Sequence, residues 1–174
     1  MIDRDKFAEL YKEVYRELYK TALYRLGVPE DAENVVSDTV LDAYAGLDKL
    51  RDESAFRAWI FKILSNKINR VLREYVTRRE HEAYLSDDSI DALPTAGNVI
   101  QAAEDKTLVQ QAFTILSEEE REIVTMSVFG EQSSAEIADS MKLNRNTVRS
   151  KYSRALTKMR EYLDRGGDMY GQKR

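Results

Sequence analysis

The apolar residues in the first half of the chain recur at the spacing of helix faces. Over residues 7–26 they return every three or four positions, and Gly27 follows where a helix can end in the left-handed conformation. Pro29 suits the first turn of a second helix, which has acids near its start. After a polar loop, Ser54 can cap a third helix over residues 56–75. These patterns predict a three-helix domain.

The helical spacing fades after Arg79 and resumes near Leu108. The intervening residues 84–97 are rich in Ser, Asp, Thr, Pro and Gly, a composition typical of linkers. We therefore expect a first domain over residues 1–80, a linker over 81–105, a second domain over 106–165 and a loose tail over 166–174.

Capping patterns divide the second half into short helices. Ser117 and Ser133 each stand three residues before a glutamate, which is the capping-box arrangement. A short helix after Ser133, a tight turn and a longer helix capped by Asn144 have the proportions of a helix-turn-helix. This motif predicts contact with duplex DNA.

The composition fits a folded, helical chain. Of 174 residues, 43% are hydrophobic and 33% charged, with two Pro, seven Gly and no alternating apolar pattern. We expect an all-α fold of two small helical domains joined by a flexible linker. The absence of Cys excludes a disulfide framework and thiol catalysis. No apolar run approaches the roughly 20 residues of a membrane span, so we expect a soluble, cytoplasmic protein.

Positive charge gathers in the last helix although the net charge is −4. Residues 144–165 include seven Lys or Arg against two acids, and the side chains expected to face outward are arginines and short polar groups. Such groups reach base edges and phosphates. A solvated helix face is the alternative, which the preceding helix and turn make less favoured. The outward residues are Asn146, Arg149, Ser150, Ser153, Thr157 and Arg160.

One face of the third predicted helix combines cations, amides and an indole. This mixture suits single-stranded DNA, where cations track phosphates and aromatic rings stack on bases. A lone tryptophan is as often part of a core, so both interpretations of Trp59 stay open. The stripe consists of Lys62, Asn66, Asn69 and Arg73, with Trp59 and Arg70 on its border.

The second predicted helix is acidic, which indicates either a protein contact or a solvated face. Catalytic interpretations are weaker, since the single histidine, His81, lies near the linker and there is no glycine-rich phosphate loop. We expect no enzyme activity, no cofactor and no metal site.

Two long segments resemble one family. Residues 51–73, RDESAFRAWIFKILSNKINRVLR, resemble region 2 of extracytoplasmic-function (ECF) sigma factors of bacterial RNA polymerase. Residues 116–163 resemble region 4 of the same factors, and residues 32–38 resemble their polymerase-binding helix. The order and spacing of these segments agree with the family. The resemblance implies a sigma factor that binds RNA polymerase core and directs promoter-specific initiation.

The resemblance also implies roles for single residues. In the first domain, Asn34, Asp38 and Asp42 would dock on the clamp helices of the polymerase largest subunit. Asn66, with Leu50, Arg51 and Asp52, would receive a base flipped from the minus-ten element, a step that costs a few kcal/mol. Trp59 and Lys62 would hold the melted strand. Asn69, Arg70 and Arg73 complete the expected minus-ten surface.

In the second domain the resemblance places the start of the last helix on the minus-thirty-five element. Arg149, Ser150, Ser153 and Arg154 would enter the major groove, while Arg145 and Lys151 would lie nearer the phosphates, beside Asn146. The sequence departs from the family at Ser37, where glutamine is usual, and at Asn69-Arg70, where an aspartate-bearing pair is common. The family also implies an anti-sigma factor as a partner.

Two other classes of function are compatible with parts of the sequence. A stand-alone helix-turn-helix regulator would bind an operator without contacting polymerase. This hypothesis gives no function to the stripe at Lys62 and Asn66. A helical adaptor would bind proteins and have no DNA affinity. Substitution of Asn66 separates these hypotheses from the sigma-factor hypothesis.

Overall fold

The computed structural model describes residues 3–85 and 107–171, which contain seven α-helices, two short 3-10 turns and no strand. The all-α prediction is confirmed. The first domain comprises α1 (Arg4–Leu26), α2 (Pro29–Ala45) and α3 (Phe56–Leu85), with the turns η1 (Leu47–Lys49) and η2 (Glu53–Ala55) between α2 and α3. The second comprises α5 (Leu108–Thr114), α6 (Glu118–Val128), α7 (Ser134–Met141) and α8 (Arg145–Gly171). Within these ranges no helix combines the length and apolar character needed to cross a membrane.

Local caps define the helices of the first domain. Asp3 accepts a hydrogen bond from the Lys6 amide at 2.9 Å and so begins α1. Gly27 ends α1 with φ of 75°, and its N–H donates to the Leu23 carbonyl at 2.8 Å. Pro29 occupies the first turn of α2. The three helices enclose one apolar core, whose fully buried members include Leu18, Ala22, Leu26, Ala32, Ala43, Ile60, Leu64 and Ile68.

Three capping boxes begin the first three helices of the second domain. Ser117 with Glu120, and Ser133 with Glu136, form the reciprocal bonds expected from the sequence. A third box, at Thr107 and Gln110, begins α5. Lys142 takes the left-handed conformation, φ 56°, and makes the tight turn between α7 and α8. The domain packs around two clusters, centred on Ile123, Met126, Ile137 and Val148 and on Phe113, Leu116, Val124 and Ala155.

Two helices are longer than expected. α3 continues to Leu85, beyond the expected boundary at residue 80, because residues 81–85 include no Gly or Pro to end the helix. α8 continues to Gly171, although a loose tail was expected from residue 166. Glycine in a helix costs about 1 kcal/mol relative to alanine. At Gly166 the missing Cβ gives Leu108 of α5 room to pack, since a Cβ there would lie 2.9 Å from its Cδ1.

The residue that caps the start of the α3 region is not the one expected from the sequence. Ser54 was expected to cap this helix, but it lies inside the η2 turn. Asp52 caps this turn, which leads directly into α3, and its carboxylate accepts from the Ser54 amide at 2.9 Å and from the Ser54 hydroxyl at 2.7 Å. The remaining expected linker residues, 86–105, lie outside the described residues.

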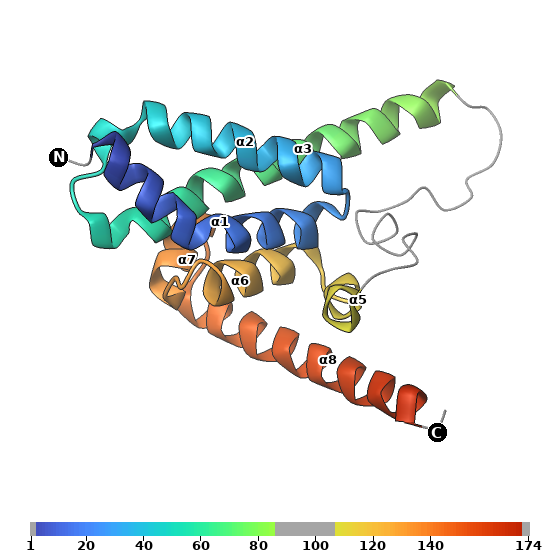
Figure 1. The fold of residues 1–174 in the computed structure, drawn as a ribbon. Helices are drawn as coiled ribbons and strands as arrows, with labels where there is room; N and C mark the ends of the chain where they lie inside the picture. The colour runs from blue at the N-terminus through green and yellow to red at the C-terminus, as the bar shows by residue number, and fades with distance from the viewer. Residues whose placement is uncertain (1–2, 86–106, 172–174) are drawn as a thin grey trace.

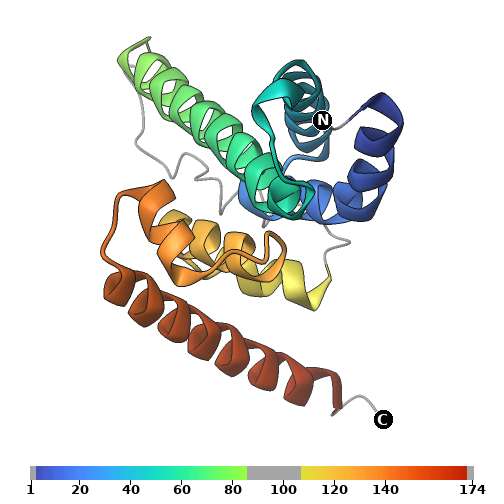
Figure 2. The same ribbon diagram turned by 90° about the vertical axis from the view of Figure 1, so that its left-hand side faces the viewer.

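The two domains pack directly on one another. α6 lies between the α1–α3 bundle and α8, as both views of the ribbon show (Figures 1 and 2). α8 thus faces away from the first domain along the opposite side of α6. One short helix therefore supports both the last helix and the contact between domains.

The capping box of α7 gives a test of the helix-turn-helix. We expect Ser133→Ala to lower the free energy of unfolding by about 1 kcal/mol, because it removes the acceptor for the Glu136 amide. Urea unfolding followed by circular dichroism measures this change. Ser134→Ala is the matched control and should cost less, since Ser134 is the first helical residue and not the cap. Equal losses in both variants would contradict the assignment.

Candidate nucleic-acid interface

The helix-turn-helix presents a polar and basic surface along the first half of α8. Asn144 begins the helix by accepting from the Asn146 amide at 2.8 Å. Val148 and Ala155 are buried and hold α8 on the domain core. The opposite side chains are exposed, and most of them are those expected to contact the minus-thirty-five element. They are Arg145, Asn146, Arg149, Ser150, Ser153, Arg154, Thr157 and Arg160.

Two lysines of α8 are paired with acids of α6. Lys151 donates to Glu119 at 2.6 Å and Lys158 donates to Glu120 at 2.6 Å. Lys151, which was expected near DNA phosphates, is half-buried and turned toward α6. Together with the buried Val148 and Ala155, these pairs orient α8 on the domain so that its arginine positions face outward.

The Glu120 carboxylate is one of the groups that hold α8 on α6. Burial acts to raise its pKa, but hydrogen bonds from Lys158 and from the Ser117 amide and hydroxyl outweigh this effect. The net result is a pKa below the ordinary 4.5 of glutamate. The charged form is therefore favoured in the folded protein, and the contact persists throughout the neutral range.

A second exposed row follows α3. Lys62, Asn66, Arg70 and Arg73 all lie on its solvent-facing side, at spacings of four, four and three residues. Arg70, expected on the border, is a full member of this row. Asn69 is not, because its side chain turns toward the second domain. The row therefore combines three cations and one amide.

The edge of this surface is partly built from core residues. Trp59 is half-buried, packs 6.2 Å from the Phe56 ring and lies next to Gly46. Leu50, expected beside the flipped base, is 7% exposed and packs its side chain into the core. Its apolar side chain gains more from burial than from contact with a polar base edge. Arg51 remains exposed.

Asp52 has a structural task in the same loop. Its bonds to the Ser54 hydroxyl and amide lower the pKa of the carboxyl. The loop before α3 is thus held in one conformation by Asp52, while Arg51 next to it projects into solvent. A preformed loop costs less to order when a ligand binds.

The outer face of α2 is acidic with an apolar side chain in it. Asn34 and Asp38 are exposed, as expected for a docking surface. Asp42 is also exposed but forms an ion pair of 2.6 Å with Lys67 of α3. Leu41 is 66% exposed, and sequence reasoning did not single it out. Its position three residues after Asp38 places it on the polar side of α2, and this spacing is the sequence signal for its exposure.

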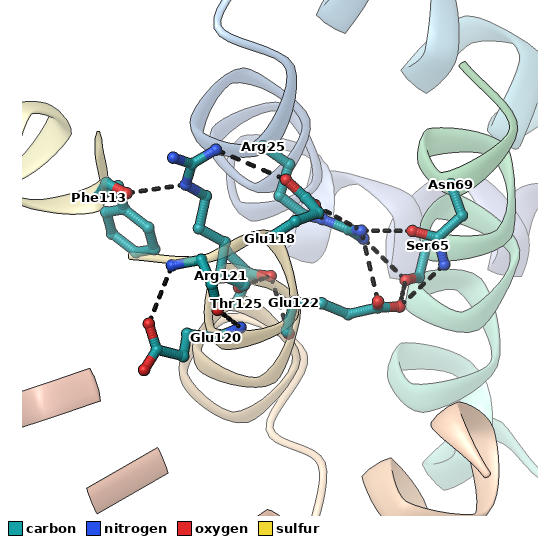
Figure 3. A network of polar contacts seen from close by, with 10 residues as sticks. Arg25, Ser65, Asn69, Phe113, Glu118, Glu120, Arg121, Glu122 and Thr125 are labelled. Carbon is teal, nitrogen blue, oxygen red and sulfur yellow. Dashed lines mark hydrogen bonds and ion pairs between the residues drawn. The ribbon is translucent and has the colours of Figure 1, made fainter. Parts of the chain in front are cut away.

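The contact between domains is centred on Arg25 (Figure 3). Its guanidinium is fully buried and bonds to groups of both domains. Sequence reasoning missed this residue, although it falls seven positions after Leu18 on the apolar stripe of α1, where a charge is unusual. The bonds run to Ser65 (2.9 Å) and Asn69 (2.5 Å) of α3, and to Glu118 (3.0 Å) and Glu122 (3.5 Å) of α6.

Further bonds close this network. Glu122 accepts from the Ser65 hydroxyl at 2.5 Å and from the Asn69 amide at 3.1 Å. Arg121 on α6 donates to the Phe113 and Thr114 carbonyls, at 2.8 and 3.1 Å. These bonds provide hydrogen-bond donors for backbone carbonyls at the end of α5. Burial lowers the pKa of Arg121, although Glu118 partly compensates and Arg25 adds to the lowering. Two acids thus face two arginines at the junction.

An apolar contact and a peripheral ion pair flank the network. The Tyr24 ring of α1 lies 4.8 Å from the Phe113 ring and 5.8 Å from the Phe129 ring. Arg57 of α3 donates to the Phe129 carbonyl at 2.7 Å and pairs with Glu131 at 3.6 Å. The interface between domains is therefore mixed, with buried polar groups at its centre.

The helical fold thus presents three separate polar surfaces, an acidic one on α2 and basic ones on α3 and α8, and comparisons with known proteins show its family. Residues 10–78 match the family model described as Sigma-70 region 2, and residues 106–159 match Sigma-70, region 4. The sigma factor CnrH of Cupriavidus metallidurans is 30% identical over 149 residues, covering 79% of this chain and 76% of CnrH. SigM of Mycobacterium tuberculosis, an ECF sigma factor, is 27% identical over 168 residues, covering 94% and 82%.

A solved structure has a similar fold. The sigma factor RpoE from Bartonella quintana, crystallised with the anti-sigma factor NepR, matches with a TM-score of 0.71 at 23% identity, covering 91% of this chain and 96% of RpoE. The two regions define the chain as an initiation factor of the sigma-70 class. It belongs to the ECF sigma factors. Its function is promoter-specific initiation of transcription with RNA polymerase.

The pair between Lys158 and Glu120 gives a test of how α8 is held. We expect Lys158→Met to raise the pKa of Glu120, because a hydrogen bond and a positive charge are lost while the burial remains. Stability gained from a lowered carboxyl pKa is present above the unfolded value and is lost as pH falls through the folded one. The variant should therefore lose less stability than the parent between neutral and acid pH. NMR titration of the carboxyl carbons measures the pKa.

Arg160→Met is the control for that titration. Arg160 is exposed on the same helix and appears in no bond to Glu120. An unchanged Glu120 pKa in Lys158→Met, or an equal rise in both variants, would contradict the role given to Lys158.

Proposed function

We propose that each polar surface has a separate task in promoter opening. The outer face of α2 docks on the core polymerase, the exposed row of α3 captures the melted minus-ten strand, and the first half of α8 enters the minus-thirty-five major groove. The observation that carries this division is the separation of three exposed surfaces, one acidic and two basic, on three different helices. The chemistry of RNA synthesis belongs to the polymerase in this proposal.

The row on α3 suits a single strand. Lys62, Arg70 and Arg73 can follow the phosphates, while the Asn66 amide both donates and accepts and so can read a base edge. Trp59 and the fixed loop at Asp52 border the row. Asn69 can join this surface only if it leaves its bonds to Arg25 and Glu122.

The surface on α8 suits a duplex. A helix fits the major groove, and arginine can bond to guanine through two donors. Arg149 and Arg154 lie on the exposed side with Ser150 and Ser153 between them. Arg145 and Asn146 at the helix start are placed to approach the backbone or bases. Lys151 contributes less directly, because its ammonium group is paired with the Glu119 carboxylate.

The surface on α2 suits a protein partner. Exposed acids can pair with basic side chains, and the exposed Leu41 offers an apolar contact at the centre of such an interface. Asp42 is shared with Lys67, so Asn34, Asp38 and Leu41 are the more available groups. The helix α2 lies on the side of the first domain that is away from the second domain (Figure 1).

We also propose an anti-sigma factor as a protein partner. Its support is the similarity over both domains to a sigma factor that was crystallised with the anti-sigma factor NepR. Such a partner would keep the factor from the polymerase until a cellular signal releases it.

Asn66→Ala tests the proposed minus-ten contact. We expect it to abolish promoter choice and opening while core binding stays intact, because only the contact with the single strand is removed. Reconstitution with bacterial core polymerase measures co-elution and start-site selection on a genomic DNA library. Asn34→Ala is the amide-matched variant and should instead weaken co-elution. Normal start-site selection by Asn66→Ala would contradict the proposal, and DNA binding without core association would favour a stand-alone regulator.

Arg149→Ala tests the duplex contact. We expect its affinity for promoter duplex to fall by about 5- to 150-fold, since a good bidentate arginine contact is worth about 1–3 kcal/mol. Fluorescence anisotropy at fixed salt, with the selected promoter and a scrambled duplex, measures the change. Arg16→Ala is the charge-matched control, because Arg16 is exposed on α1 in the first domain. Equal losses on both duplexes would show a phosphate contact and contradict base recognition.

A further inference from the structure

We propose that Lys67 and Tyr75 of α3 are positioning residues, which hold the exposed row of α3 at one orientation to the outer face of α2. This inference rests on the proposed function, in which the row captures the melted strand and the outer face docks on the polymerase. Lys67 forms an ion pair with Asp42 near the end of α2, and the Tyr75 hydroxyl donates to Asp31 near its start. We call these two bonds the braces.

The braces lie at opposite ends of the packed pair of helices. On α2, Asp31 and Asp42 are separated by about 16 Å of helix at 1.5 Å per residue. On α3, Lys67 and Tyr75 are separated by about 12 Å. The start of α2 is bonded to the later part of α3, so the helices run antiparallel and are held near both ends. Two separated bonds restrict a rotation that one bond would leave free.

The core between the two helices supplies contacts that are less directional. The α2 side chains enclosed there include Ala32, Thr39 and Ala43, which have no exposed surface. The Thr39 hydroxyl donates to the Val35 carbonyl of its own helix at 2.7 Å, so this bond stays within α2. Hydrophobic contact is non-directional, whereas a hydrogen bond weakens steeply as its angle departs from linear. The braces therefore define the orientation more sharply than the apolar core does.

One brace directly adjoins both functional surfaces. Lys67 follows Asn66 of the α3 row in the sequence. Its partner Asp42 follows Leu41 of the outer face of α2. A displacement at this brace would therefore move Asn66 relative to Leu41, and so move the proposed strand contact relative to the proposed polymerase contact. A binding group on a fixed support costs less to order when its ligand arrives.

The surroundings of the two α3 side chains favour the bonded state. Lys67 is 12% exposed, so its ammonium group has little access to water and gains from the Asp42 carboxylate at 2.6 Å. Tyr75 is half-buried, and burial together with the bond to Asp31 raises the pKa of its phenol. The phenol therefore remains a donor throughout the neutral range. Because Asp42 is 60% exposed, its ion pair should add little to stability, so a change of orientation can be measured in a folded protein.

Removal of both braces tests the proposal in the reconstituted polymerase. Lys67→Met removes the charge but keeps a long side chain, and Tyr75→Phe removes only the hydroxyl. At saturating core, we expect each variant to lower the rate of minus-ten opening by about two- to fivefold, because the other brace still holds one end. The double variant should lower it by about tenfold or more, with unchanged affinity for core. Permanganate reactivity of unpaired thymines measures opening.

Matched controls separate orientation from a general loss of stability. Lys20→Met and Tyr15→Phe make the same chemical changes at exposed positions of α1. Val14→Ala leaves a cavity in the core and lowers stability without removing either brace. All three should open the promoter at the parental rate at a temperature where circular dichroism shows each protein folded. An equal loss of opening in Val14→Ala and in the double variant would overturn the proposal.

A distance measurement without polymerase or DNA tests the braces independently of the proposed function. The chain has no Cys, so spin labels can be placed on Ala45→Cys in α2 and Thr77→Cys in α3, both at exposed positions. Pulsed electron resonance then reports the distribution of distances between the helices. We expect removal of both braces to broaden this distribution while helix content stays the same. A distribution as narrow as that of the parent would contradict the role given to the braces.

Asn66→Ala in the same opening assay distinguishes failure of this inference from failure of the proposed function. Normal opening by Asn66→Ala would contradict the proposed minus-ten contact and, with it, this inference. Loss of opening by Asn66→Ala, together with parental opening by the double variant, would overturn only the positioning role of Lys67 and Tyr75.

Discussion

A single buried guanidinium connects the two halves of this molecule. Arg25 has no exposed surface, and its charge is acceptable there only because carboxylates of α6 face it and Ser65 and Asn69 take its remaining donors. Arg25 is therefore the central polar contact that positions α6, and with it α8, against the first domain.

α6 connects the Arg25 contact to the polar surface of α8. α6 bears the acids that meet Arg25 and also the acids that meet Lys151 and Lys158 of α8. Its consecutive glutamates thus point to different partners on opposite sides of one helix. This arrangement explains why a helix of 11 residues suffices to organise both contacts.

Local patterns in the sequence predicted most of the fold because caps and apolar spacing are local properties. The boxes at Ser117 and Ser133, the turn at Gly27 and the helix start at Pro29 are all present. The extent of α8 was mispredicted because Gly166 is stabilised by packing against Leu108, which is distant in sequence. For a similar reason Asn69 was placed on the exposed stripe and Arg25 was missed, since the glutamates that bond them belong to the other domain. The exposed rows on α3 and α8 could be predicted from helical spacing alone. The one exception is in the α3 row, where Arg70 is exposed and Asn69 is not.

The pairing of lysines on α8 bears on how the factor behaves among non-target DNA. Counterion release grows with the number of phosphates that free cations neutralise, by about 0.9 in the logarithmic salt slope for each. Lys151 and Lys158 already have carboxylate counterions within the protein. The helix therefore attracts random duplex less strongly than its count of basic residues implies. A factor with weak affinity for arbitrary sequence spends less time on the genome and more time available to the polymerase.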